Sequence, residues 1–236
     1  TTAVALAAVL KADRCEILTD VDGLYSADPR VVSEAKILTS VDYDSALEMA
    51  SLGAKMQARS IELAKKFDVD VEIASSQAEK KSGTRVSSTK EVPNNFIEQL
   101  RILSVATKDG FNLFRVDTTL FSFFELLSDV NYPLKLISQI GDKVTFLIER
   151  EKVVQLKEVL HTKQLKFAEI ENVSTVALVG EGINHSNQII KEASQFLKSE
   201  QEECLLCVNN SASNIFVVRT RFKKSLANFL HGRFVK

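Results

Sequence analysis

Apolar and polar positions divide the chain into two parts with different patterns. In the first part, residues 2–11 and 42–67 have the composition and spacing of helices, while 14–18 and 69–76 are short apolar runs. Short runs of this kind are typical of strands in a parallel sheet that helices cover. Residues 2–11 are apolar on nearly every side, which predicts a helix buried on more than one face. The first part therefore reads as the tail of an α/β sandwich.

A polar stretch at 76–95 carries Gly and Pro without apolar periodicity, and we place a domain boundary there. Beyond it the pattern predicts the order β-α-β-β-α twice, which is the split βαβ arrangement. Phe146, Leu156, Leu160 and His161 recur seventy positions later as Phe216, Leu226, Leu230 and His231. This shared spacing favours an internal duplication over chance similarity of two amphipathic helices.

Charge and apolar run length narrow the classes of partner. With 31 acidic and 30 basic residues, no net field draws the chain to nucleic acid or to an anionic membrane. The sequence contains no run of about eighteen consecutive apolar residues, so we predict no membrane-spanning helix. The start, Thr1-Thr2, has neither Met nor a basic leader, so we expect no signal peptide and a fragment whose front half lies elsewhere.

Cysteine and histidine give weak signals for a site. Cys204 and Cys207 form a CxxC, but an odd spacing on a strand would send the thiols to opposite faces. No second CxxC or His pair supplies further zinc ligands, so we expect buried apolar cysteines, no metal site and a reducing cytoplasm. The three histidines, His161, His185 and His231, are expected at the surface or at helix ends.

The segment TDVDGLYSADPR, residues 19–30, directly follows the first predicted strand, at the edge where open α/β sheets bind ligands. Gly23 lets the backbone turn and approach a ligand, and Asp20 and Asp22 can accept hydrogen bonds. Tyr25 offers a flat face for a purine, and Arg30 a fork for phosphate oxygens. A plain Asp-Gly turn is the alternative, and composition alone leaves the two open.

Together with EMASLGAK at 48–55, this segment resembles the aspartate kinases (aspartokinases), members of the amino-acid kinase family. The resemblance is strong over about the first 85 residues and weaker to residue 236. It implies the tail of a three-layer α/β/α sandwich at 1–88, followed by two ferredoxin-like βαββαβ ACT domains at 89–172 and 173–236. It also implies ATP-binding positions, of which Thr19 and Asp20 would contact the adenosine and Lys55 would reach towards ATP. The segment that would wrap the nucleotide is Tyr25, Ser26, Ala27, Asp28, Pro29 and Arg30.

The family's reaction transfers the γ-phosphoryl group of ATP to the side chain of L-aspartate, with Mg2+, giving 4-phospho-L-aspartate and ADP. It is the entry step to lysine, threonine and methionine. The Lys-Phe-Gly-Gly phosphate loop, the aspartate-binding residues and the Gly-Gly-Ser-Asp motif expected before Thr1 are absent from this sequence. Because phosphoryl transfer needs the whole constellation, we expect no catalytic residue and no activity in this chain alone.

In the family, paired ACT domains bind an effector, usually lysine or threonine, and join chains into homo-oligomers. The Pro-Gly of the effector loops is absent here. Asp117, Lys135 and Gln139 are the candidate effector-binding residues. An equal alternative is that effector binding has been lost and that the modules serve assembly alone. Most of the Phe residues at 119–127 are expected in the core, and an excess would mark a dimer contact.

Three other interpretations compete. Another amino-acid kinase, such as glutamate 5-kinase, would lack the paired modules and the EMASLGAK context. A regulatory-only aspartokinase subunit would bind an amino-acid effector without catalysis, although such a subunit normally starts later. A fused aspartokinase–homoserine dehydrogenase would need a dinucleotide motif, and none occurs here.

Overall fold

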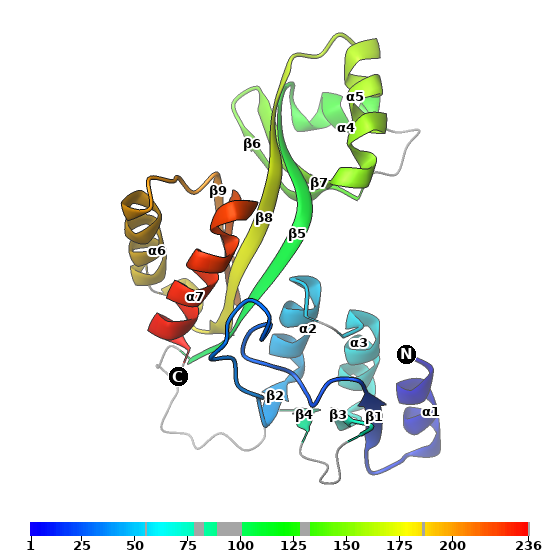
Figure 1. Ribbon diagram of the computed structural model, residues 1–236. Coiled ribbons are helices and arrows are strands. Elements are labelled where there is room, and N and C mark those ends of the chain that lie inside the picture. Colours follow the sequence, from blue (N-terminus) through cyan, green and yellow to red (C-terminus); the bar gives the residue numbers. More distant parts are fainter. Residues whose placement is uncertain (55, 78–82, 89–100, 128–132, 186, 236) are drawn as a thin grey trace. The chain divides into compact units, whose positions relative to one another are not determined.

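The computed structural model describes residues 1–54, 56–77, 83–88, 101–127, 133–185 and 187–235 (Figure 1). Helices and strands are interspersed along the described part of the chain, so the fold is mixed α/β. Two compact units divide the chain: one holds Thr1–Lys108, Thr175–Phe216 and Phe222–Lys236, and the other holds Asp109–Ser174 and Val217–Arg221.

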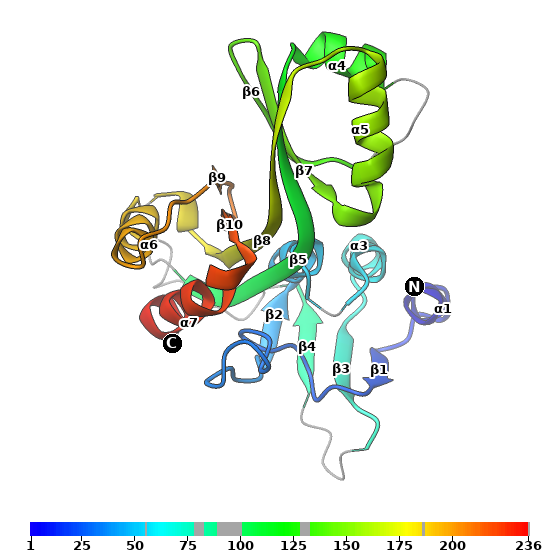
Figure 2. The same cartoon turned by 45° about the horizontal axis from the view of Figure 1, so that its top comes forward.

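The first 88 residues form a four-stranded sheet and three helices. Their bounds are α1 Thr2–Leu10, β1 Cys15–Thr19, β2 Ser40–Asp42, α2 Tyr43–Ser51, α3 Ala58–Phe67, β3 Val71–Ser75 and β4 Thr84–Ser87. Strand order is β1-β3-β4-β2, with β1 parallel to β3, β3 antiparallel to β4, and β2 parallel to β4. The helices pack on this sheet (Figure 2).

Local sequence explains where these helices begin and end. The Asp42 carboxylate accepts a 2.8 Å hydrogen bond from the Ser45 amide and so caps α2. As predicted, the helical stretch breaks at Gly53, whose φ of 118° favours glycine. Asp68 ends α3 in the left-handed region. Tyr43 anchors α2 to the end of α3, because its hydroxyl donates to the Val69 carbonyl at 2.9 Å, and burial raises the pKa of Tyr43 to about 12.

Two expectations for this region are wrong. Helix α1 buries Val4 and Ala7 but leaves Leu6, Val9 and Leu10 at least 57% exposed, so it is covered on one face rather than several. Part of the predicted polar linker forms β4, an inner strand of the sheet. Its alternate residues, Thr84 and Val86, are fully buried, which is the period of two that a strand requires.

From residue 101 on, the described residues form six strands and four helices. They are β5 Arg101–Asp117, α4 Leu120–Leu126, β6 Lys135–Ile140, β7 Lys143–Glu149, α5 Val153–Thr162, β8 Phe167–Glu181, α6 Gln188–Ser199, β9 Leu206–Asn209, β10 Ser213–Arg219 and α7 Lys223–Phe234, with short 3-10 turns at Arg150–Lys152, Ile183–His185 and Thr220–Phe222. The two strands predicted at 101–107 and 111–116 are one continuous strand, β5.

Each compact unit contains one set of these strands. In the unit that includes Asp109–Ser174 the strand order is β6-β7-β5-β8, with β7 antiparallel to both neighbours. Its core contains Phe114, Phe123 and Phe146, with ring centroids 5.0–5.9 Å apart. In the other unit the order is β5-β8-β10-β9, and α6 packs against α7.

Phenylalanine placement on α4 differs from the expectation. Only Phe123 is buried, whereas Phe121 and Phe124 are 73% and 49% exposed. A single helical face can reach the core of a two-layer unit, and the neighbouring positions on either side of Phe123 point away from it.

Candidate functional site

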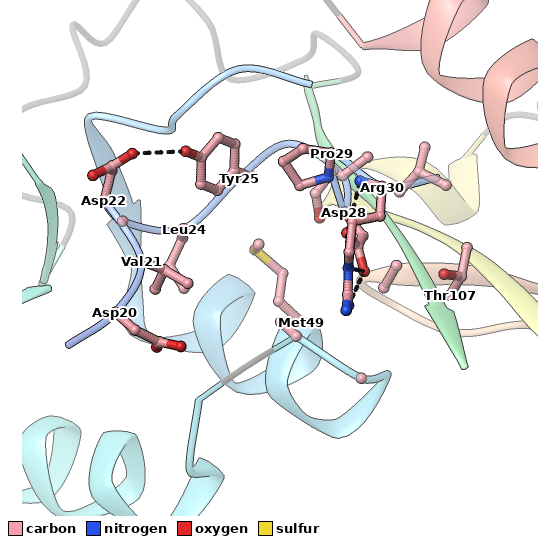
Figure 3. Close-up of a pocket in the computed structure, with 17 residues that line it drawn as sticks. Asp20, Val21, Asp22, Leu24, Tyr25, Asp28, Pro29, Arg30, Met49 and Thr107 are labelled. Atoms are coloured by element: carbon pink, nitrogen blue, oxygen red, sulfur yellow. Dashed lines mark hydrogen bonds and ion pairs between the residues drawn. The ribbon is translucent and has the colours of Figure 1, made fainter. Parts of the chain in front are cut away.

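A cavity of about 340 Å³ lies at the carboxyl end of β1, within the unit that includes Thr1–Lys108 (Figure 3). Its volume is at the lower end of the range for small-molecule sites. One wall is the predicted loop, a second is the end of α2 and the turn after it, and a third is the first half of β5. Lining residues are Asp20, Val21, Asp22, Gly23, Leu24, Tyr25, Ala27, Asp28, Pro29, Arg30, Met49, Gly53, Ala54, Ser104, Val105, Ala106 and Thr107.

Thr84 of β4 holds the first part of the loop. Its hydroxyl accepts a 2.7 Å hydrogen bond from the Leu24 amide and donates at 2.6 Å to the Leu38 carbonyl. A Cβ at Gly23 would lie 2.7 Å from the same hydroxyl oxygen, so the close approach requires glycine there. The buried Thr84 therefore fixes where the loop leaves the sheet.

Acidic and aromatic side chains face the first side of the cavity. The Tyr25 hydroxyl donates to the Asp22 carboxylate at 3.1 Å, and the Thr19 hydroxyl donates to Asp20 at 3.0 Å. Partial burial and the bond to Asp22 both raise the pKa of Tyr25. Met49, which is 2% exposed, lies between this side and Arg30 in Figure 3. The flat ring and the thioether together offer an apolar surface that fits a planar ligand.

Arg30 is held by its neighbour Asp28 on the opposite side. Its guanidinium donates to the Asp28 carboxylate at 2.6–3.2 Å, and its backbone amide donates to the same group at 2.9 Å. This pairing raises the pKa of Arg30 and keeps the cation at the mouth of the cavity. A phosphate group that bound Arg30 would compete with Asp28 or share the guanidinium with it.

Ser104 of β5 is a pocket residue that the sequence did not reveal. Its side chain is 1% exposed, and within the described part of the chain its hydroxyl has no hydrogen-bond partner. An unpaired buried hydroxyl costs free energy, and a polar ligand atom in the cavity would remove that cost. This observation favours a ligand that offers hydrogen-bonding groups as well as an apolar face.

The structure brings together six of the nine predicted nucleotide positions. Asp20, Tyr25, Ala27, Asp28, Pro29 and Arg30 line the cavity. Thr19 and Ser26 do not line it: Thr19 bonds to Asp20, and the Ser26 hydroxyl lies 2.8 Å from Nε2 of His231. Lys55 lies outside the described residues.

The pocket also includes residues that were not among the predicted nucleotide positions, at 49, 53–54 and 104–107. Gly53 packs closely against this wall, since a Cβ there would lie 3.0 Å from the Thr107 carbonyl. Residues 49 and 53–54 lie within EMASLGAK, but the match of that segment to the family pointed to Lys55 instead. Strand β5 lies far along the chain, and its approach to the loop depends on the tertiary fold.

The candidate effector residues lie in the other unit. Asp117 pairs with Lys143 at 3.8 Å, while Gln139 accepts from the Leu120 amide at 2.9 Å and donates to the Gly141 carbonyl at 2.6 Å. Lys135 lies over the ring of Phe111, at 5.9 Å. It is paired with Leu147 of β7, four positions from Lys143, or about 13 Å along the strand. Asp117 and Gln139 therefore lie at the same end of β7, on the strands either side of it, and Lys135 lies further along β6.

The CxxC expectation is corrected. We expected Cys204 and Cys207 on one strand, with their thiols on opposite faces. Cys204 instead lies before β9 begins, so that argument does not apply. Cys207 is exposed rather than buried, and a hydrogen bond from Cys204 lowers its pKa. Among the described residues no group of three or more His, Cys, Asp and Glu could hold a metal ion. No helix in the described ranges has both the length and the apolarity to cross a membrane.

Known proteins match this chain as follows. Residues 1–75 match the amino acid kinase family. Aspartokinase 2 of Bacillus subtilis is 36% identical over 199 residues, covering 78% of this chain and 48% of that protein. The aspartokinase of Pseudomonas aeruginosa is 30% identical over 251 aligned residues, covering 99% of this chain and 60% of that protein. The chain thus spans about half the length of these relatives.

The fold matches that of Escherichia coli aspartokinase III. Its structure in complex with aspartate and ADP superposes with a TM-score of 0.84 at 24% identity, covering 100% of this chain and 55% of that one. Its structure with lysine and aspartate gives 0.80 at 21% identity, with the same coverage. At these identities the likeness establishes the fold.

Proposed function

We propose that this homologue of the aspartokinases forms the carboxyl-terminal half of an aspartate kinase and supplies part of its ATP site. The complete enzyme would transfer the γ-phosphoryl group of ATP to the side-chain carboxylate of L-aspartate, giving 4-phospho-L-aspartate and ADP. The observation that carries this proposal is the cavity at the end of β1. The segment that resembles the family's nucleotide loop lines it together with Ser104, whose buried hydroxyl has no partner in the described part of the chain. The 30% identity over 99% of the chain supports the same assignment.

The roles of individual residues follow from chemistry and position. Asp20 would accept hydrogen bonds from the adenosine, and the Tyr25 ring with Met49 would pack on its apolar surface. Ser104 would donate to a nucleotide atom. Arg30, held at the mouth by Asp28, would meet the phosphates. Lys55 lies outside the described residues, and its role of reaching towards ATP rests on the resemblance alone.

Ser26 and Thr19 would act differently from the other predicted positions. The Ser26 hydroxyl is used by His231 and by the Lys36 amide, so it would shape the loop rather than touch ATP. The Thr19 hydroxyl is used by Asp20 and would orient that carboxylate. Magnesium would arrive on the phosphates, because this ion keeps several waters and needs only one or two carboxylates from the protein.

We further propose that residues 1–88 belong to a sandwich domain and that two ferredoxin-like ACT modules, 89–172 and 173–236, follow it in the sequence. Strand orders β6-β7-β5-β8 and β5-β8-β10-β9 support this, since each has the order 2-3-1-4 of that fold if β5 and β8 are shared between the modules. E. coli aspartokinase III has been solved with lysine, which supports an amino-acid effector such as lysine or threonine. Exposed Phe121 and Phe124 support a homo-oligomer.

Titration of the chain with ATP, ADP and GTP tests the nucleotide site. We expect ATP and ADP to bind at one site, and Ala54→Leu, which fills the cavity, to abolish binding. Val154→Ala, at an exposed position of α5, is the control and should leave binding unchanged. The proposal fails if millimolar ATP and ADP do not bind, or if Ala54→Leu binds them as before.

A regulatory-only subunit is the second candidate, supported by the two modules. Titration with lysine, threonine and methionine separates the two ideas. Effector binding without nucleotide binding would favour the regulatory subunit, and nucleotide binding without any effector would favour modules that serve assembly. Asp117→Asn and Gln139→Ala should weaken an effector that binds at the end of β7, whereas Lys135→Met should not.

A further inference from the structure

Helix α7, near the end of the chain, hydrogen-bonds the loop that lines the cavity. Nε2 of His231 lies 2.8 Å from the Ser26 hydroxyl oxygen, and the two side chains are 5% and 2% exposed. One turn earlier, the Asn228 amide donates to the Val31 carbonyl at 3.0 Å. Residues three apart share a helix face, so α7 presents both groups to the loop together. His231 was expected at the surface or at a helix end; it lies in the last turn of α7, and it is buried there.

Each polar group of Ser26 already has a partner within the protein. Its backbone amide donates to the Lys36 carbonyl at 2.8 Å, and its carbonyl accepts from the Val105 amide at 2.7 Å. Its hydroxyl oxygen accepts from the Lys36 amide at 3.0 Å and lies 2.8 Å from Nε2 of His231. Burial first, and then Lys36, lower the pKa of His231, while Glu34 opposes them, so the ring favours its neutral form, in which Nε2 can donate to the hydroxyl or accept from it according to the tautomer.

Between Ser26 and Val31 lie the residues that form one side of the cavity: Ala27, Asp28, Pro29 and Arg30. Thr84 fixes the loop only as far as Leu24 and again at Leu38. The bonds at Ser26 and Val31 therefore bracket the cavity wall, and two of them come from α7.

We propose that His231 and Asn228 are positioning residues that hold the wall at 26–31 in the shape that binds nucleotide. The proposal rests on the proposed function for the identity of the ligand, but not for the fastening itself. A loop that is already ordered loses less conformational entropy when a ligand binds, so releasing it weakens binding without removing any ligand contact. Loss of one buried hydrogen bond should lower affinity about fivefold to thirtyfold.

The internal duplication supplies a matched control. His161 occupies the equivalent place on α5, is exposed, and packs edge-on against Phe167 with centroids 5.3 Å apart. His161→Leu therefore removes a histidine from the same motif without touching the loop. His231→Gln is the conservative variant, because a glutamine amide can replace Nε2 of histidine as a hydrogen-bonding group.

The experiment compares His231→Leu, His231→Gln and His161→Leu in the whole chain by hydrogen exchange and by titration with ADP. In His231→Leu we expect faster exchange at the amides of Val31 and Val32, which bond to the Asp28 carbonyl, and weaker ADP binding. His231→Gln should restore most of both. His161→Leu should match the unmodified chain in both.

Two results would overturn the inference: unchanged exchange at 26–32 in His231→Leu, or glutamine no better than leucine. Should His231→Leu fail to fold, Asn228→Ala, at a half-buried position, gives the same test through Val31. If the unmodified chain binds no ADP, the proposed function fails, whereas exchange at 26–32 still decides whether α7 holds the loop.

Discussion

Helices α5 and α7 carry the same Leu-x-x-x-Leu-His pattern and use it in two ways. The leucines behave alike, since Leu156, Leu160, Leu226 and Leu230 are all at most 1% exposed. The histidines differ: His161 is exposed on α5, while His231 on α7 is buried against Ser26. The apolar positions are determined by the sheet beneath each helix. The polar position depends on what covers the opposite face of the helix, which the shared pattern does not encode.

The buried leucines that α5 and α7 share should give the largest effects on the free energy of unfolding. Leu160→Ala and Leu230→Ala should each lower the free energy of unfolding by about 3 kcal/mol, because each removes a fully buried side chain from its own core. Urea unfolding followed by hydrogen exchange in each compact unit measures both losses. A difference of more than about 2 kcal/mol between the two variants would show that the two cores are not equivalent.

A second pair of variants distinguishes a serine hydroxyl that stabilises the fold from one that binds the ligand. Ser174 is fully buried and bonds to Asp109 and Thr220 at 2.7 and 2.8 Å, whereas Ser104 is equally buried and has no partner among the described residues. Ser174→Ala should lower the free energy of unfolding by about 1–2 kcal/mol and leave ADP affinity unchanged.

Ser104→Ala should do the opposite, with unchanged stability and about fivefold weaker ADP binding. Titration and urea unfolding of the two variants side by side measure both quantities. Stability lost in Ser104→Ala with full ADP affinity would mean that Ser104 serves the core rather than the ligand.

The sequence predicted those features that depend on local pattern. The helices near 2–10, 43–51 and 58–67, the break at Gly53, strands β1 and β3, and the order of elements after residue 100 are confirmed. A parallel strand followed by a loop is enough to place a candidate site at the strand's carboxyl end. Ten residues of that loop line a cavity, and six of them are predicted nucleotide positions.

Features that depend on tertiary contacts escaped prediction. Strand β4 lies in a polar stretch and is held by its neighbours β3 and β2 rather than by its own apolarity. The cavity wall at 104–107 comes from a strand predicted to belong to another domain. Burial of His231 requires α7 to meet a loop 205 positions earlier in the chain, and no local pattern records that contact.

Acidity should destabilise the folded chain through the buried His231. Burial first, and then Lys36, lower the pKa of His231 from 6.5, while Glu34 opposes them. A depressed pKa means that the folded chain favours the neutral ring. The stability from this group is then complete above about pH 6.5 and is lost as the pH falls towards the folded-state pKa.

Urea unfolding between about pH 5 and 8 measures this dependence. It should become flatter in His231→Gln and remain in His161→Leu. An unchanged slope in His231→Gln would place the acid sensitivity in another group.

The smallest expected effect concerns an ion pair that joins α7 to α6. Arg233 donates to the Glu192 carboxylate at 2.7 and 3.1 Å, and these bonds, with one from Gln188, lower the pKa of Glu192 to about 2. Stability from Glu192 is therefore complete above its ordinary pKa of 4.5 and is lost as the pH falls from there towards about 2.

Because Arg233 is about half exposed, solvent and salt screen the pair, and Arg233→Met should lower the melting temperature only slightly at neutral pH. Glu192→Gln should remove this part of the acid sensitivity, and the difference should shrink in high salt. An equal loss at all salt concentrations would mean that Arg233 stabilises α7 through the packing of its aliphatic stem rather than through its charge.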